Sequence, residues 1–88
     1  MMLPEIIQLA KDAKARGGRL FLVGGTVRDA LLKQPVKDYD LEVYGLSPAD
    51  IRSLLEPYGQ VHDVGQAFGI LKLHLGTHEI DVAAPRRD

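Results

Sequence analysis

The chain has 88 residues, which fits one small domain, and its 45% hydrophobic and 26% charged residues are ordinary for a soluble globular fold. The formal net charge of −1 gives no general attraction to nucleic acid or membranes, and the absence of cysteine excludes disulfides and cysteine-ligated zinc. Because no apolar stretch is long enough to span a bilayer and the N-terminus lacks a signal-peptide pattern, we expect a cytoplasmic protein without membrane partners.

The first predicted element is a helix that begins near Pro4 and ends at Gly17-Gly18. Its apolar face is predicted to comprise Leu3, Ile6, Ile7, Ala10 and Ala13. A strand is predicted over 19–23, where the sequence RLFLV is rich in strand formers. Two glycines follow, and a short helical pattern is then expected over 26–33.

The middle of the chain predicts a half-buried strand and a capped helix. In the sequence DYDLEVY, apolar and acidic residues alternate, so Tyr39, Leu41 and Val43 should face the core. The opposite face should carry Asp38, Asp40 and Glu42. A helix should begin after Ser47, because a serine followed by proline and, three residues on, by an acid is typical of a helix N-terminus.

The last third of the chain predicts a β-hairpin around Gly76-Thr77. A two-residue loop there pairs Lys72 with Asp81 across the two strands, on the polar face. The shared apolar face comprises Leu71, Leu73, Leu75, Ile80 and Val82. Helices thus alternate with strands, which predicts an α/β or α+β fold around one mixed sheet.

The glycine pair and the acidic strand are the candidate functional features. Glycines between a strand and a helix can present backbone N–H groups to a phosphate, although such a pair is often only a turn. Asp38 and Asp40 lie two apart on one strand, so their carboxylates share a face and would repel without a cation. A solvated face is the alternative for that pair, and an ion pair with Lys72 is the alternative for Asp81.

Three carboxylates beside a phosphate-binding turn predict a two-metal site for Mg²⁺, which prefers oxygen ligands. In such a site the metals stabilise the attacking and leaving oxygens when a nucleotide α-phosphate is displaced. The glycines would hold the triphosphate of the nucleotide, and Asp38, Asp40 and Asp81 would hold the metals. We assign Glu42 to solvent and the three histidines to the strand surface.

Two stretches closely resemble the head of class II tRNA nucleotidyltransferases (CCA-adding enzymes) and bacterial poly(A) polymerases. They are LVGGTVRDALL and VKDYDLEV, and twelve residues lie between Gly25 and Asp38. The later VGQAFGILKLHLGTHEIDVAAPRRD resembles the downstream part of the same polymerase-β-like nucleotidyltransferase domain. The resemblance covers roughly Arg19 to Asp88. It implies a mixed sheet of about four or five strands with about three helices, as one domain over 1–88, with an N-terminal helix over 1–18 and a catalytic core over 19–88.

The resemblance also implies the roles of individual residues. Gly24 and Gly25 would contact the triphosphate, while Arg28, Lys37 and Arg86 would meet phosphate charge. Asp38 and Asp40 would ligate two Mg²⁺ ions, and Asp81 would help hold the catalytic metal and orient or deprotonate the attacking 3′-hydroxyl. The substrates would be ATP or CTP and the 3′ end of a tRNA or other RNA, with pyrophosphate released.

The resembled enzymes continue beyond the point that corresponds to Asp88, so we expect this chain to be the N-terminal portion of a truncated head domain. Two alternatives remain open at this stage. The chain could be a non-catalytic module that binds nucleotide and metal or merely folds, or a minimal nucleotidyltransferase that modifies a protein. A truncated sheet would expose an edge or an apolar patch, so self-association is also expected.

Overall fold

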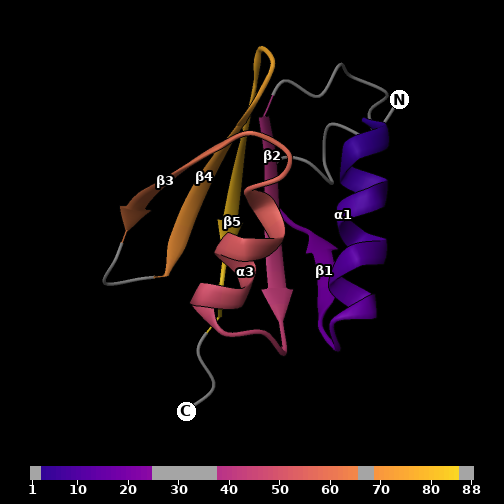
Figure 1. The fold of residues 1–88 in the computed structure, drawn as a ribbon. Coiled ribbons are helices and arrows are strands. Elements are labelled where there is room, and N and C mark those ends of the chain that lie inside the picture. Colours follow the sequence, from indigo (N-terminus) through magenta and orange to yellow (C-terminus); the bar gives the residue numbers. More distant parts are fainter. Residues whose placement is uncertain (1–2, 25–37, 66–68, 86–88) are drawn as a thin grey trace.

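The structure, a computed structural model, describes residues 3–24, 38–65 and 69–85. In this part of the chain, five strands form one mixed sheet in the order β1-β2-β5-β4-β3 (Figure 1). The strands are β1 (Arg19–Leu22), β2 (Asp38–Tyr44), β3 (Gln60–Gly65), β4 (Ile70–Leu75) and β5 (His78–Ala83). Strands β2 and β5 pair in parallel, and the other neighbouring pairs are antiparallel. The predicted mixed α+β fold is therefore confirmed.

Two helices in the described residues, α1 (Pro4–Ala15) and α3 (Pro48–Leu55), cover one face of the sheet (Figure 1). The buried core consists of Ile6, Leu9, Ala13, Tyr39, Leu41, Val43, Ile51, Leu54, Leu55, Leu71, Leu73, Ile80 and Val82. These residues come from both helices and from one face of strands β2, β4 and β5. The other face of β2 is left to its acidic residues, as the alternating sequence predicts.

Local sequence signals explain where the helices begin. Ser47 Oγ accepts a hydrogen bond of 3.1 Å from the backbone N–H of Asp50, so the predicted N-cap of α3 is confirmed. Pro4 stands in the first turn of α1, where its missing N–H costs no helical hydrogen bond. The buried face of α1 consists of Ile6, Leu9 and Ala13, whereas Ile7 is 49% exposed. The buried face is therefore rotated slightly about the helix axis from the predicted one. The helix predicted over 26–33 lies outside the described residues.

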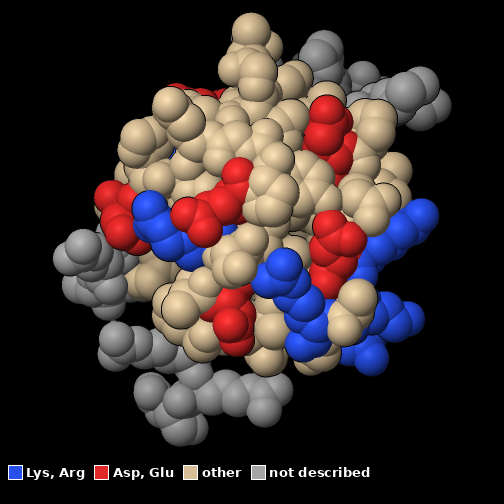
Figure 2. Space-filling model, viewed as in Figure 1, with Lys and Arg blue, Asp and Glu red and all other residues tan. Residues whose placement is uncertain are grey.

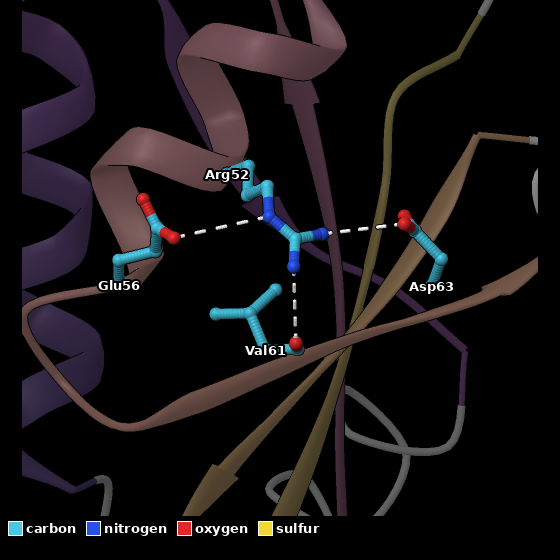
Figure 3. A network of polar contacts seen from close by, with 4 residues as sticks. All are labelled: Arg52, Glu56, Val61 and Asp63. Carbon is cyan, nitrogen blue, oxygen red and sulfur yellow. Dashed lines mark hydrogen bonds and ion pairs between the residues drawn. The ribbon is translucent and has the colours of Figure 1, made fainter.

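Polar contacts join the helices to the rest of the fold. Arg52 on α3 donates to Val61 O at 3.4 Å and forms ion pairs with Asp63 at 3.3 Å and Glu56 at 3.8 Å (Figure 3). The Tyr58 hydroxyl, after α3, donates a hydrogen bond to Asp12 Oδ2 on α1.

The surface does not carry one kind of charge on the face that Figure 2 shows, because acidic and basic side chains are interspersed there. Neither described helix is long and apolar enough to cross a membrane.

Candidate active site

The site is built on the parallel pair of strands β2 and β5. Asp40 on β2 lies directly opposite Asp81 on β5, and Asp38 lies opposite Glu79 in the same register. Asp40 and Asp81 are half-buried, and Asp38, at the first position of β2, is exposed. The parallel pairing therefore places two carboxylates that are 41 residues apart in the sequence side by side on the face not covered by the helices.

The turn after β1 approaches this pair closely. The backbone N–H of Val23 donates to Asp40 O at 2.9 Å, which fixes the end of β1 against β2. Gly24 has a φ of +60°, and a Cβ placed there would lie 3.3 Å from Asp40 Oδ2. Glycine is therefore favoured at this position both by its left-handed backbone and by its close approach to the carboxylate.

Gly24, Asp40 and Asp81 line one cleft of about 300 Å³. Among the described residues, the cleft is lined by Val23, Gly24, Asp40, Leu41, Glu42, Ile70, Asp81 and Ala83. Three of the residues selected from the sequence are thus brought together. The predicted phosphate-binding residues Gly25, Arg28, Lys37 and Arg86 lie outside the described residues.

The environment of Asp40 disfavours a negative charge when no cation is present. Burial raises the pKa of the Asp40 carboxyl above 3.8, and the negative charges of Asp81 and Asp38 raise it further. This is the effect expected when carboxylates lie close together. A bound cation would reverse this effect, because it would favour the ionised form of each carboxylate.

Asp81 contacts a lysine on its other side. Its Oδ1 is buried and has no well-formed hydrogen bond to the described residues, but Lys72 Nζ lies 3.5 Å away, at ion-pair distance. Lys72 also donates a hydrogen bond of 3.3 Å to Glu79 Oε2. The hydrogen bond to Glu79, followed by the charge of Asp81, raises the pKa of Lys72. The Lys72–Asp81 ion pair, anticipated as the structural alternative for Asp81, is therefore present.

The donor set fits a hard divalent cation only in part. No group of three acidic or histidine side chains within 3–24, 38–65 and 69–85 is arranged to hold a metal ion by itself. Mg²⁺, however, is usually bound by one or two carboxylates together with substrate phosphates and water, rather than by an all-protein cage. The Asp40 and Asp81 carboxylates, with a buried oxygen that lacks a hydrogen bond, fit that kind of site.

A second hollow, of about 510 Å³, adjoins the cleft and shares Val23 and Glu42 with it. Its lining includes Phe21, which is 48% exposed, and Tyr44, whose ring meets that of Phe21 edge to face at 5.5 Å. The Tyr44 hydroxyl donates a hydrogen bond of 3.2 Å to Glu42. Glu42, assigned to solvent from the sequence, thus has a partner on the protein. Phe21 on β1 lies opposite Glu42 on β2, a neighbour that alternation in the two strands could have suggested.

Solved structures of tRNA nucleotidyltransferases and CCA-adding enzymes are similar to this chain, and three of them are described here. A CCA-adding enzyme with ATP is 27% identical, with a TM-score of 0.79, over 97% of this chain and 22% of that chain. A tRNA nucleotidyltransferase complexed with a primer tRNA and an incoming ATP analog is 34% identical, with a TM-score of 0.74, over 90% of this chain and 23% of that chain. The Bacillus stearothermophilus CCA-adding enzyme in complex with CTP is 28% identical, with a TM-score of 0.71, over 93% of this chain and 20% of that chain.

This chain therefore spans between a fifth and a quarter of the length of these relatives. The sequence itself matches one family, described as the Poly A polymerase head domain, over residues 20–88. That match begins within β1 and contains the turn at Gly24 and all three carboxylates of the candidate site. Because it extends over most of the sequence, the chain belongs to the Poly A polymerase head domain family.

Proposed function

We propose that this chain is the part of a tRNA or RNA nucleotidyltransferase that binds the nucleoside triphosphate and its Mg²⁺ ions. The reaction would add CMP or AMP, from CTP or ATP, to the 3′ end of a tRNA or other RNA. The observation that carries the proposal is the pairing of Asp40 with Asp81 across parallel strands, beside the close approach of Gly24. The lack of cysteine fits a cytoplasmic setting.

In the proposed reaction, the 3′-hydroxyl oxygen of the RNA attacks the α-phosphorus of the nucleotide. A bond forms between these two atoms, the bond from the α-phosphorus to the bridging oxygen of the β-phosphate breaks, and pyrophosphate leaves. The attacking hydroxyl gives up its proton to the carboxylate of Asp81, which we assign to orient and deprotonate this hydroxyl. Bound Mg²⁺ would supply charge stabilisation for the attacking and leaving oxygens.

The other residues would act by holding the triphosphate and the metals. Asp40 and Asp81 are the proposed central ligands, and Asp38, exposed at the start of β2, would add a third carboxylate. Gly24 and Gly25 would present backbone N–H groups to phosphate oxygens, because neither glycine has a Cβ to keep the phosphates away. Positive charge for the phosphates is assigned to Arg28, Lys37 and Arg86.

The substrates are proposed because proteins similar to this chain are described as complexes with ATP, with CTP, and with a primer tRNA plus an ATP analog. Self-association through an exposed edge of the sheet is a separate proposal. It is supported by the place of β1 and β3 at the two edges of the described sheet.

A calorimetric titration of ATP and of CTP into this chain tests the proposal. The titrations are made with Mg²⁺, with EDTA, and with the Asp40→Ala variant. We expect heat of binding only when both Mg²⁺ and Asp40 are present. Binding that is equally strong in EDTA, or equally strong in Asp40→Ala, would contradict a metal-dependent site at Asp40. The Glu5→Ala variant, which removes an acid from the first turn of α1, is the control for a general loss of negative charge.

A further inference from the structure

Lys72 lies in the sheet next to the candidate active site, in line with its two facing carboxylates. It lies on β4 directly opposite Asp81 on β5, and Asp81 in turn lies directly opposite Asp40 on β2. The three side chains therefore form one row across three neighbouring strands, with Asp81 between a cation and an acid. A metal ion bound by Asp40 and Asp81 would share the Asp81 carboxylate with the ammonium group of Lys72.

The ammonium group of Lys72 contacts two acidic side chains, those of Glu79 and Asp81. Its Nζ lies 3.3 Å from Glu79 Oε2 and 3.5 Å from Asp81 Oδ1. The Lys72 side chain is 27% exposed, so most of its aliphatic stem is covered by the surrounding sheet. Because Glu79 already accepts a hydrogen bond from Lys72, the ammonium group keeps a partner if it moves away from Asp81.

The other contacts of Asp81 make this lysine important. The buried Oδ1 of Asp81 has no well-formed hydrogen bond to the described residues, and the neighbouring Asp40 carries charge of the same sign. A buried carboxylate oxygen without a partner is costly, so a nearby cation compensates it. Lys72 provides that compensation in the protein without metal, from the side of Asp81 that faces β4.

We infer that Lys72 is a resident counter-ion that competes with the metal for Asp81 and makes metal binding depend on the incoming triphosphate. This inference rests on the proposed function. A metal that arrives alone must bind beside the ammonium charge and draw Asp81 away from it. A metal that arrives with the triphosphate brings negative charge as well, which offsets that repulsion, while Glu79 retains the ammonium group.

The test measures Mn²⁺ binding by electron paramagnetic resonance of the free ion, with and without ATP. The Lys72→Met variant removes the charge and keeps the length of the side chain. The Lys11→Met variant makes the same change on an exposed position of α1, and Lys72→Arg keeps the charge in place. We expect Lys72→Met to bind Mn²⁺ alone about tenfold more tightly, which corresponds to about 1.4 kcal/mol. ATP should increase the Mn²⁺ affinity of Lys72→Met by a smaller factor than it increases that of the unchanged protein. Lys72→Arg and Lys11→Met should both behave like the unchanged protein.

Equal Mn²⁺ binding by Lys72→Met and Lys11→Met would overturn the inference and leave Lys72 as a cross-strand structural pair. The proposed function would survive that outcome if ATP still strengthened Mn²⁺ binding in an Asp40-dependent manner. If ATP did not strengthen Mn²⁺ binding to the unchanged protein, both the proposed function and the inference would fail.

A second variant serves if Lys72→Met does not fold. Glu79→Gln leaves the ammonium group to Asp81 alone and should weaken the binding of Mn²⁺ without ATP. Glu42→Gln removes an equivalent negative charge two residues from Asp40, on the same face of the sheet. A loss of affinity in Glu79→Gln that is no larger than in Glu42→Gln would overturn the inference.

Discussion

Asp40 on β2 and Asp81 on β5 face each other directly across a parallel pair of strands, although they are 41 residues apart in the sequence. The sheet therefore holds two like charges together, and burial and both neighbouring acids raise the pKa of Asp40. Repulsion between two such like charges costs stability, and a cation bound between them would reduce that cost. The pairing is the physical basis for the metal-dependent function proposed above.

Replacing Asp40 with asparagine should stabilise the metal-free protein at pH 7. Removing one of two facing like charges is expected to raise the free energy of unfolding by roughly 0.2–1 kcal/mol. Because the pKa of Asp40 is raised in the folded protein, the penalty is absent below its ordinary value of 3.8 and develops as the pH rises through the raised value. Urea unfolding of both proteins between pH 3.5 and 7, in EDTA, measures this difference.

Glu42→Gln is the matched control for that experiment, since it neutralises an acid two residues away on the same face of β2. Glu42 lies opposite Ala83 on β5 rather than opposite an acid, so its neutralisation should stabilise the protein less. A decrease in stability for Asp40→Asn at pH 7 would show that Asp40 is a structural residue.

The glycine turn is tested by comparing Gly24→Ala with Gly76→Ala. Both glycines have positive φ, +60° and +62°, so both substitutions should cost about 1 kcal/mol of stability or somewhat more. Only at Gly24 would the new Cβ meet a site residue, at 3.3 Å from Asp40 Oδ2, whereas nothing lies within 4 Å at Gly76. Gly24→Ala alone should therefore weaken the binding of Mg²⁺ and ATP in calorimetry. Equal nucleotide affinity in the two variants would argue against a role for the Gly24 turn in binding.

The hydrogen bond from Tyr58 to Asp12 should stabilise the fold over a defined pH range. It lowers the pKa of Asp12 below 3.8, and burial together with this bond raises the pKa of Tyr58 from 10.0 to about 12. The contribution is therefore lost as the pH falls through the lowered pKa of Asp12, and also as the pH rises from 10.0 towards 12.

Tyr58→Phe should lower the midpoint of thermal unfolding by a few degrees at pH 7. The difference from the unchanged protein should disappear above pH 12, where the tyrosine is ionised in both folded and unfolded chains. Thermal melts followed by circular dichroism measure it. A difference that stays constant from pH 7 to pH 12 would show that packing of the ring, rather than its hydroxyl, explains the loss.

Local features of the fold followed directly from the sequence. The two-residue turn at Gly76-Thr77 sets the register of β4 and β5, and the predicted pairing of Lys72 with Asp81 is confirmed. Alternation in β2 likewise placed Tyr39, Leu41 and Val43 in the core, each of them 1% exposed. Short-range turn chemistry and the two-residue period decide these features, so the sequence alone was enough to predict them.

Long-range features did not follow in the same way. The parallel pairing of β2 with β5, which brings Asp40 to Asp81, depends on how the chain between these strands folds back and not on the sequence of either strand. The sharing of Lys72 between Glu79 and Asp81 depends on side-chain distances, which no sequence pattern supplies. The exposure of Ile7 depends on how α1 is rotated against β1 and α3.

The most direct test of the account is a double-mutant cycle on the binding of Mn²⁺ and ATP, with Asp40→Asn, Asp81→Asn and the double variant. If the two carboxylates hold the same metal site, each single variant should lose nearly all of the metal-dependent affinity, and the double variant should lose little more. Losses that simply add, or single variants that bind Mn²⁺ and ATP as tightly as the unchanged protein, would contradict a shared site at Asp40 and Asp81.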